Sequence, residues 1–117
     1  GMIYRISTNK NTFYIQYLSA INGALGLSKK EIMILSEFLK VKEALKGNDD
    51  LVFSSITRKK VQTKLGISQH NLNNYIKALK GKKALILEDS ILRINKNIIP
   101  AVKDGKYSVT FNFNING

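Results

Sequence analysis

The chain has 117 residues, and 19 lysines and arginines against 8 aspartates and glutamates give it a net charge of +11. This length and a hydrophobic fraction of 44% predict one domain spanning residues 1–117. No apolar run reaches the roughly 18 residues of a membrane helix, so a cytoplasmic protein without membrane contact is expected. Because there is no cysteine and only one histidine, thiolate and all-imidazole metal sites are excluded, and we expect no metal, cofactor, small-molecule substrate or enzymatic activity.

The N-terminal part contains two apolar, aromatic segments, residues 3–7 and 12–18, separated by Thr-Asn-Lys-Asn. This pattern fits two short strands, or one strand that continues into a helix. We predict a strand near 12–16 and a short helix from about 18 to 25. Gly23 and Gly26 are expected to weaken that helix.

A well-capped helix is predicted from Ser28 to Lys46. Ser28 followed by Glu31 forms a capping box, in which each side chain satisfies a free backbone N–H group of the other residue. Gly47 follows the last helical residue and suits the helix end. The positions predicted to face the core share helical spacing, and they are Ile32, Leu35, Leu39, Ala44 and Leu45.

Two further helices are predicted over residues 55–65 and from about Ser68 to Lys80. Ser55 or Thr57 would cap the first, whose apolar positions are Ile56, Val61 and Leu65. The turn between the helices is Gly66-Ile67-Ser68, in which glycine suits a left-handed residue and serine suits the next cap. The apolar positions of the second helix, which ends at Gly81, are Leu72, Tyr75, Ile76 and Leu79.

Strands are predicted in the C-terminal part. Residues 84–87 and 91–94 are short apolar segments joined by Glu88-Asp89-Ser90, which predicts a hairpin. Residues 107–115 alternate, which is typical of a half-buried antiparallel strand. On one side lie Val109, Phe111, Phe113 and Ile115, and on the other lie Ser108, Thr110, Asn112 and Asn114.

Positive charge is concentrated in one segment of the chain. Between Thr57 and Lys83 there is no acidic residue, whereas the helix at 28–46 carries Glu31, Glu37 and Glu43. A lysine-rich composition inherited from an AT-rich genome would spread lysine evenly, so this segregation favours a surface that faces phosphates. The basic residues of the segment are Arg58, Lys59, Lys60, Lys64, Lys77, Lys80, Lys82 and Lys83.

The segment from Thr57 to Ile86 resembles the winged helix-turn-helix superfamily. The matching positions are Val61, Leu65, Gly66, Ile67, Ser68, Leu72, Ile76 and Leu79, followed by Lys82-Lys83-Ala84-Leu85-Ile86. The aromatic residues 12–17 and the Leu-Ser-x-x-Glu helix start at 27–31 also resemble plasmid and phage replication proteins of this fold. The resemblance implies an α+β winged helix-turn-helix, with three or four helices, a β-hairpin wing and an additional terminal strand.

The helix from Ser68 to Lys80 would then be the recognition helix in the major groove of DNA. Amide side chains suit adenine and lysine suits guanine, so the predicted base-reading residues are Gln69, His70, Asn71, Asn73, Asn74 and Lys77. The predicted phosphate contacts are Arg58, Lys59, Lys60, Lys64, Lys80, Lys82, Lys83 and Arg93. The alternative to base contact is that the polar residues of this helix form a solvated face. Tyr14, Tyr17, Phe111 and Phe113 would either stack on single-stranded bases or, more often, lie in the core.

The favoured function is sequence-specific binding of double-stranded DNA, as a small transcription regulator or as a replication or maintenance factor of a phage or plasmid-like element. A homodimer is expected, joined through the terminal strands or through the helix at 28–46. A non-catalytic protein-interaction or structural module with the winged-helix fold is the main alternative. Binding of structured RNA is a third hypothesis, because basic residues do not distinguish RNA from DNA.

Overall fold

The computed structural model describes residues 2–100 and 107–113. These residues form an α+β structure with four helices and an antiparallel hairpin, in agreement with the predicted fold class. The elements in chain order are β1 (Met2–Thr8), α1 (Lys10–Leu25), α2 (Lys29–Leu45), the short 3-10 helix η1 (Asp49–Leu51), α3 (Ser55–Leu65), α4 (Gln69–Gly81), β2 (Leu85–Glu88), β3 (Ile91–Ile94), the 3-10 helix η2 (Lys96–Ile98) and β4 (Tyr107–Phe113).

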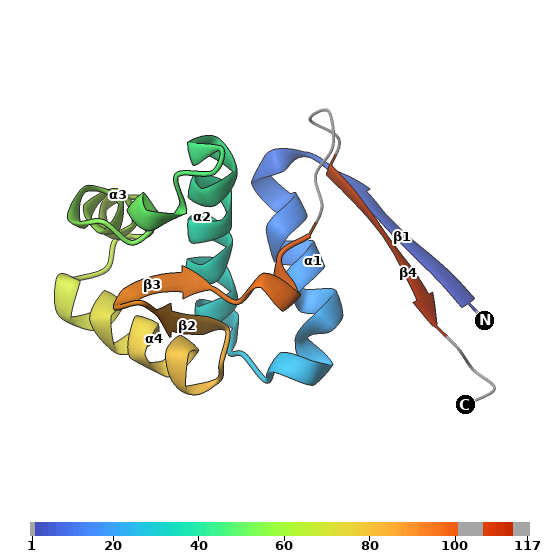
Figure 1. Cartoon of the computed structure of the whole chain (residues 1–117). Helices are drawn as coiled ribbons and strands as arrows, with labels where there is room; N and C mark the ends of the chain where they lie inside the picture. Colours follow the sequence, from blue (N-terminus) through green and yellow to red (C-terminus); the bar gives the residue numbers. More distant parts are fainter. Residues whose placement is uncertain (1, 101–106, 114–117) are drawn as a thin grey trace.

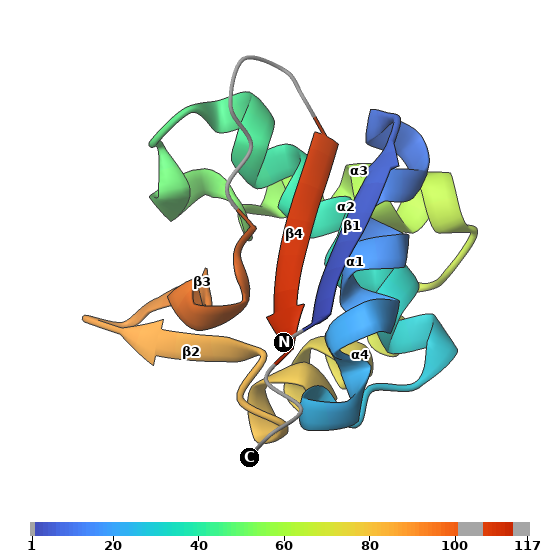
Figure 2. The same ribbon diagram turned by 90° about the vertical axis from the view of Figure 1, so that its right-hand side faces the viewer.

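Helix α2 stands at the centre of the molecule. Helix α1 lies on one side of it, and α3, α4 and the β2–β3 hairpin lie on the other (Figure 1). Strands β1 and β4 pair antiparallel and form a two-stranded ribbon beyond α1 (Figure 2). The ribbon and the α3–α4 pair therefore occupy opposite ends of the molecule.

The prediction of a strand at 12–16 and a helix at 18–25 is wrong, because one helix, α1, covers both segments. Asn9 begins it, with its Oδ1 accepting a hydrogen bond from the Thr12 backbone N–H at 3.2 Å. Phe13 and Tyr17, four residues apart, lie on the same face of this helix and are both buried, as are Tyr14 and Leu18. Tyr14 and Tyr17 are therefore core residues, and the hypothesis that they stack on nucleic-acid bases is wrong.

The predictions for α2 are confirmed at its start and in most of its core. The capping box is complete, with Ser28 Oγ accepting from the Glu31 N–H at 3.1 Å and Glu31 Oε1 accepting from the Ser28 N–H at 2.8 Å. Of the predicted apolar stripe, Ala44 is exposed and Leu45 half-buried, since they lie in the last turn. The buried positions of the helix are Ile32, Ile34, Leu35, Phe38 and Leu39.

The turn between α3 and α4 follows the prediction. Gly66 adopts a left-handed conformation with φ of 65°, and Ser68 caps α4 by accepting a hydrogen bond from the Asn71 N–H at 3.1 Å. The predicted caps of α3 are wrong, because Ser54 is the cap, and its Oγ accepts from the Thr57 N–H at 3.4 Å. Ser55 and Thr57 are already helical at that point.

The two sheets each consist of one strand pair. In the β2–β3 hairpin Leu85 pairs with Ile94, and both residues of its tight turn, Asp89 and Ser90, have positive φ values of 51° and 66°. Strand β4 confirms a strand in the predicted 107–115 segment. The prediction that this strand is half-buried depends on side chains that the structure does not describe. Ile115 lies outside the described residues.

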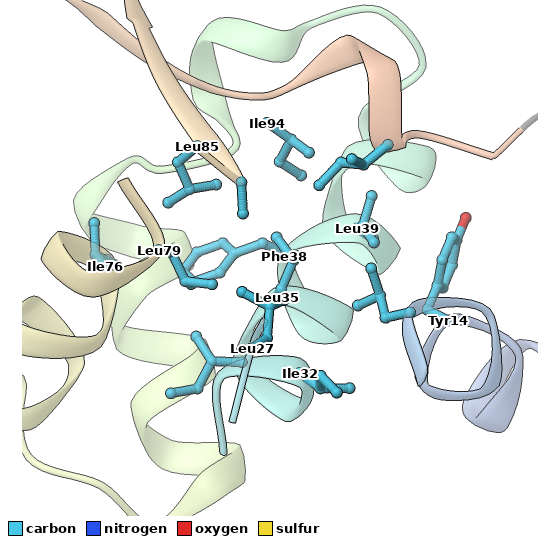
Figure 3. Packing of buried hydrophobic residues seen from close by; sticks show 14 of the residues in the cluster. Tyr14, Leu27, Ile32, Leu35, Phe38, Leu39, Ile76, Leu79, Leu85 and Ile94 are labelled. Carbon is cyan, nitrogen blue, oxygen red and sulfur yellow. The ribbon is translucent and has the colours of Figure 1, made fainter. Parts of the chain in front are cut away.

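One apolar core joins α1, α2, α4 and the hairpin around α2. Phe38, Leu35 and Leu39 of α2 lie at its centre, between Leu79 and Leu85 on one side and Tyr14 on the other (Figure 3). Phe38 is fully buried, and its ring centroid lies 4.4 Å from that of Phe53. None of the helices within the described ranges is long and apolar enough to cross a membrane.

Candidate nucleic-acid interface

Two adjoining grooves run between α3, α4 and the hairpin. The groove between α4 and the hairpin has a volume of about 720 Å³, and the groove between α3 and α4 has a volume of about 660 Å³. They share four lining residues, Phe53, Ser54, Arg58 and Asn73, so they form one continuous surface, which we call the basic groove. Its polar and charged lining residues are Asp50, Ser54, Ser55, Arg58, Lys59, Gln62, Gln69, Asn73, Lys77, Lys80 and Ser90, of which Asp50 is acidic.

Arg58 joins the two helices at the middle of the basic groove. Its Nε donates a hydrogen bond to the Phe53 carbonyl at 2.9 Å, and its Nη1 donates to Asn73 Oδ1 at 3.3 Å. These bonds hold the guanidinium on the surface of α4 with other N–H groups still free to donate. These contacts therefore fix the positions of both the Arg58 guanidinium and the Asn73 amide.

The predicted base-reading residues are all exposed, but α4 divides them between two neighbouring faces. Gln69, Asn73 and Lys77 follow one another at intervals of four residues and line the basic groove. His70 and Asn74 lie beside them and contact each other, with Asn74 Nδ2 3.3 Å from His70 Nε2. Asn71 is exposed and does not line the groove.

The helix termini add partial positive charge to this surface. Neither α3 nor α4 has an acidic residue in its first turn, so no carboxylate neutralises the positive end of either helix dipole there. Backbone N–H groups at a helix start favour anions. The start of α3 borders the basic groove through Ser54 and Ser55, and the start of α4 borders it through Gln69.

Three of the predicted phosphate contacts form ion pairs within the molecule instead of standing free. Lys64 lies 2.9 Å from Glu37, Lys82 lies 2.6 Å from Glu31, and Arg93 lies 2.7 Å from Asp50 and 3.5 Å from Glu88. The other predicted lysines are exposed, and among residues 12–100 no carboxylate forms an ion pair with them. They are Lys59, Lys60, Lys80 and Lys83, and Lys77 shares this property.

Among the described residues, Glu31 and Glu37 are the carboxylates whose pKa values shift clearly. Burial would raise the pKa of Glu31, but hydrogen bonds from Lys82 and Ser28 outweigh burial and hold the pKa below its ordinary value of 4.5. Burial likewise would raise the pKa of Glu37, and hydrogen bonds from Lys40 and Lys64 lower it below 4.5. Both groups are therefore charged near neutral pH and hold the ends of α3 and α4 against α2.

These two depressed pKa values predict acid destabilisation. A carboxylate with a lower pKa in the folded chain contributes stability that is complete above about pH 4.5 and is lost as the pH falls through the folded-state pKa. We expect the thermal midpoint to be steady between about pH 8 and 5.5 and to fall by about 5 °C or more below pH 4.5. Thermal unfolding followed by circular dichroism between pH 3 and 8 measures this.

The matched variant for this prediction is Glu31→Gln/Glu37→Gln. Glutamine retains the capping-box acceptor but cannot titrate, so the fall in the midpoint below pH 4.5 should become shallower. An unchanged pH profile in this variant would show that other groups cause the acid destabilisation.

Ser55 and Gln62 belong to this surface but were not among the residues predicted to contact DNA. Both line the groove between α3 and α4. The signal was present in the spacing, because Ser55, Arg58, Lys59 and Gln62 recur at the three- and four-residue intervals that place residues on one helix face. In the described part of the chain, no group of three His, Asp or Glu side chains is arranged to hold a metal ion.

Comparison with protein-family models, with curated proteins and with solved structures found no match. The function is therefore inferred from the geometry and charge of the basic groove.

Proposed function

We propose that the chain is a winged helix-turn-helix protein that binds double-stranded DNA, with α4 as the recognition helix and the β2–β3 hairpin as the wing. The observation that carries this proposal is the composition of the basic groove. Arg58, Lys59, Lys77 and Lys80 line it together with the amides of Gln62, Gln69 and Asn73. Cations that bind phosphates beside amides that pair with base edges are what duplex recognition requires.

In this proposal α4 enters the major groove with its N-terminal half leading. Gln69 and Asn73 would contact base edges, and their amides suit the paired acceptor and donor of adenine. Arg58, Lys59, Lys77 and Lys80 would contact phosphates on either side, assisted by the positive N-terminal ends of the α3 and α4 dipoles. His70 and Asn74, on the neighbouring face, would contact bases only where the helix lies deep in the groove.

The homodimer expected from the sequence is part of the proposal. Helix α2 is a poor candidate for its interface, because seven of its residues are buried within the monomer. The β1–β4 ribbon is the better candidate, because it lies at the end opposite the basic groove and would leave the groove free (Figure 1). Such a protein would act as a transcription regulator or as a replication or maintenance factor of a phage or plasmid-like element.

A salt titration tests duplex binding directly. Four phosphate contacts, one for each cation of the basic groove, predict a slope of log K against log salt near −3.6 and a loss of about 150-fold in affinity between 50 and 200 mM salt. Gel retardation or fluorescence anisotropy with a random 25-base-pair duplex measures it. No binding at low salt would contradict the proposal, and stronger binding to a structured RNA competitor would redirect it to RNA.

A protein-interaction module is the second candidate function, and one observation favours it. Ile56 on the outer face of α3 is 71% exposed and lies among Lys59, Lys60, Thr63 and Lys64 in a mostly apolar hollow of about 440 Å³. This hollow would receive an apolar side chain of a partner protein. The absence of duplex binding, together with retention of the fold, would favour this candidate.

A further inference from the structure

The tip of the hairpin carries a charge opposite to that of the basic groove. Glu88 and Asp89 are exposed at the turn, and Asp50 of η1 lies against the hairpin through its ion pair with Arg93. Arg93 also lies 3.5 Å from Glu88. Arg93 thus pairs with two carboxylates, and with the exposed Asp89 the tip has an excess of negative charge.

This negative tip borders the same surface that would hold DNA. Asp50 and Ser90 line the groove between α4 and the hairpin, across from Lys77 and Lys80. Asp50 is the acidic residue that lines this groove with the lysines of α4, whereas Glu88 and Asp89 line a neighbouring hollow of the hairpin together with Arg93 and Lys96. Phosphates within a Debye length of the tip, about 8 Å at physiological salt, would be repelled from it.

We propose that Glu88, Asp89 and Asp50 hold the hairpin away from the phosphate backbone, so that α3 and α4 alone hold the duplex. The negative tip then weakens binding to every duplex, whatever its sequence. This inference rests on the proposed function and deepens it. Arg93, predicted from the sequence to contact phosphate, instead neutralises part of the tip. Specificity is a difference between affinities, and repulsion that weakens all phosphate binding leaves base contacts to decide which sites are occupied.

The test is the affinity of the Glu88→Gln/Asp89→Asn variant for a random duplex. Asparagine tolerates the left-handed conformation of residue 89, so the turn is expected to be kept. One phosphate contact is worth roughly a factor of eight in 0.1 M salt, and removing two nearby carboxylates is expected to tighten binding about fivefold. Glu88→Lys/Asp89→Asn should add a further factor of roughly eight and steepen the salt slope by about one.

The matched control is Gln16→Lys/Ala20→Lys, which raises the net charge by the same amount as the first variant. Both positions are exposed on α1, away from the basic groove. If the tip variants bind no tighter than this control, or more weakly than the unaltered chain, the inference about the hairpin is overturned while duplex binding stands. If the unaltered chain binds no duplex at low salt, the proposed function fails and this inference fails with it.

Discussion

The variant Lys77→Gln/Lys80→Gln is expected to bind a random duplex about sixtyfold more weakly than the unaltered chain in 0.1 M salt. Each lost phosphate contact costs roughly a factor of eight under these conditions, and the salt slope should become shallower by about two. Both lysines are exposed on α4 and line the basic groove. Glutamine keeps much of the side-chain length and helix propensity, so the loss would be electrostatic. Fluorescence anisotropy across a salt series measures both quantities.

The control for this prediction removes the same charge from another surface. Lys29 and Lys30 are exposed at the start of α2 and do not line the basic groove. Lys29→Gln/Lys30→Gln should weaken binding less than about threefold, because these lysines do not line the groove in which phosphates would be contacted. Equal losses in the two variants would mean that net charge, and not the groove, determines binding.

Phe38→Ala is expected to lower the free energy of unfolding by about 3–5 kcal/mol. Phe38 is fully buried at the centre of the core, and its ring lies against Phe53, which lines both halves of the basic groove. Truncation removes apolar contacts and leaves a cavity that the surrounding helices cannot fill completely. A loss of this size is a large part of the total stability of a small domain.

Urea unfolding followed by circular dichroism tests this prediction, with the midpoint expected to fall sharply. Met33→Ala is the matched control, because Met33 lies on the same helix but is 39% exposed. Its substitution should change the free energy of unfolding by less than about 0.5 kcal/mol. A loss below about 1.5 kcal/mol for Phe38→Ala would contradict the central position of this ring in the core.

Two helix starts and one turn were predictable from local contacts, although the equally local cap of α3 at Ser54 was not. The capping box of Ser28 and Glu31, the cap at Ser68 and the left-handed Gly66 all depend on residues within a few positions of one another. The prediction of a strand at residues 12–16 was wrong because the aromatic and β-branched residues of this segment have high strand propensity. Its buried positions follow helical spacing, and packing of Phe13 and Tyr17 against the core outweighs that propensity.

The candidate site was predictable only in part, for a related reason. The acid-free segment from Thr57 to Lys83 correctly indicated a basic surface on α3 and α4. It did not indicate which cations remain free, because the carboxylates that pair with them come from distant positions. Glu31 is 51 residues from Lys82 in the sequence, and Asp50 is 43 residues from Arg93. Ion pairs between such distant residues have no periodic signal in the sequence.

The β1–β4 ribbon has a consequence for the order in which the chain folds. Its register joins Met2 to Phe113, so almost the whole chain must be brought together before a single backbone hydrogen bond of the ribbon can form. That closure has a large entropic cost, whereas the helices and the β2–β3 hairpin form from near neighbours. The ribbon is therefore expected to assemble last and open first, and its amides should exchange with deuterium much sooner than those of α2.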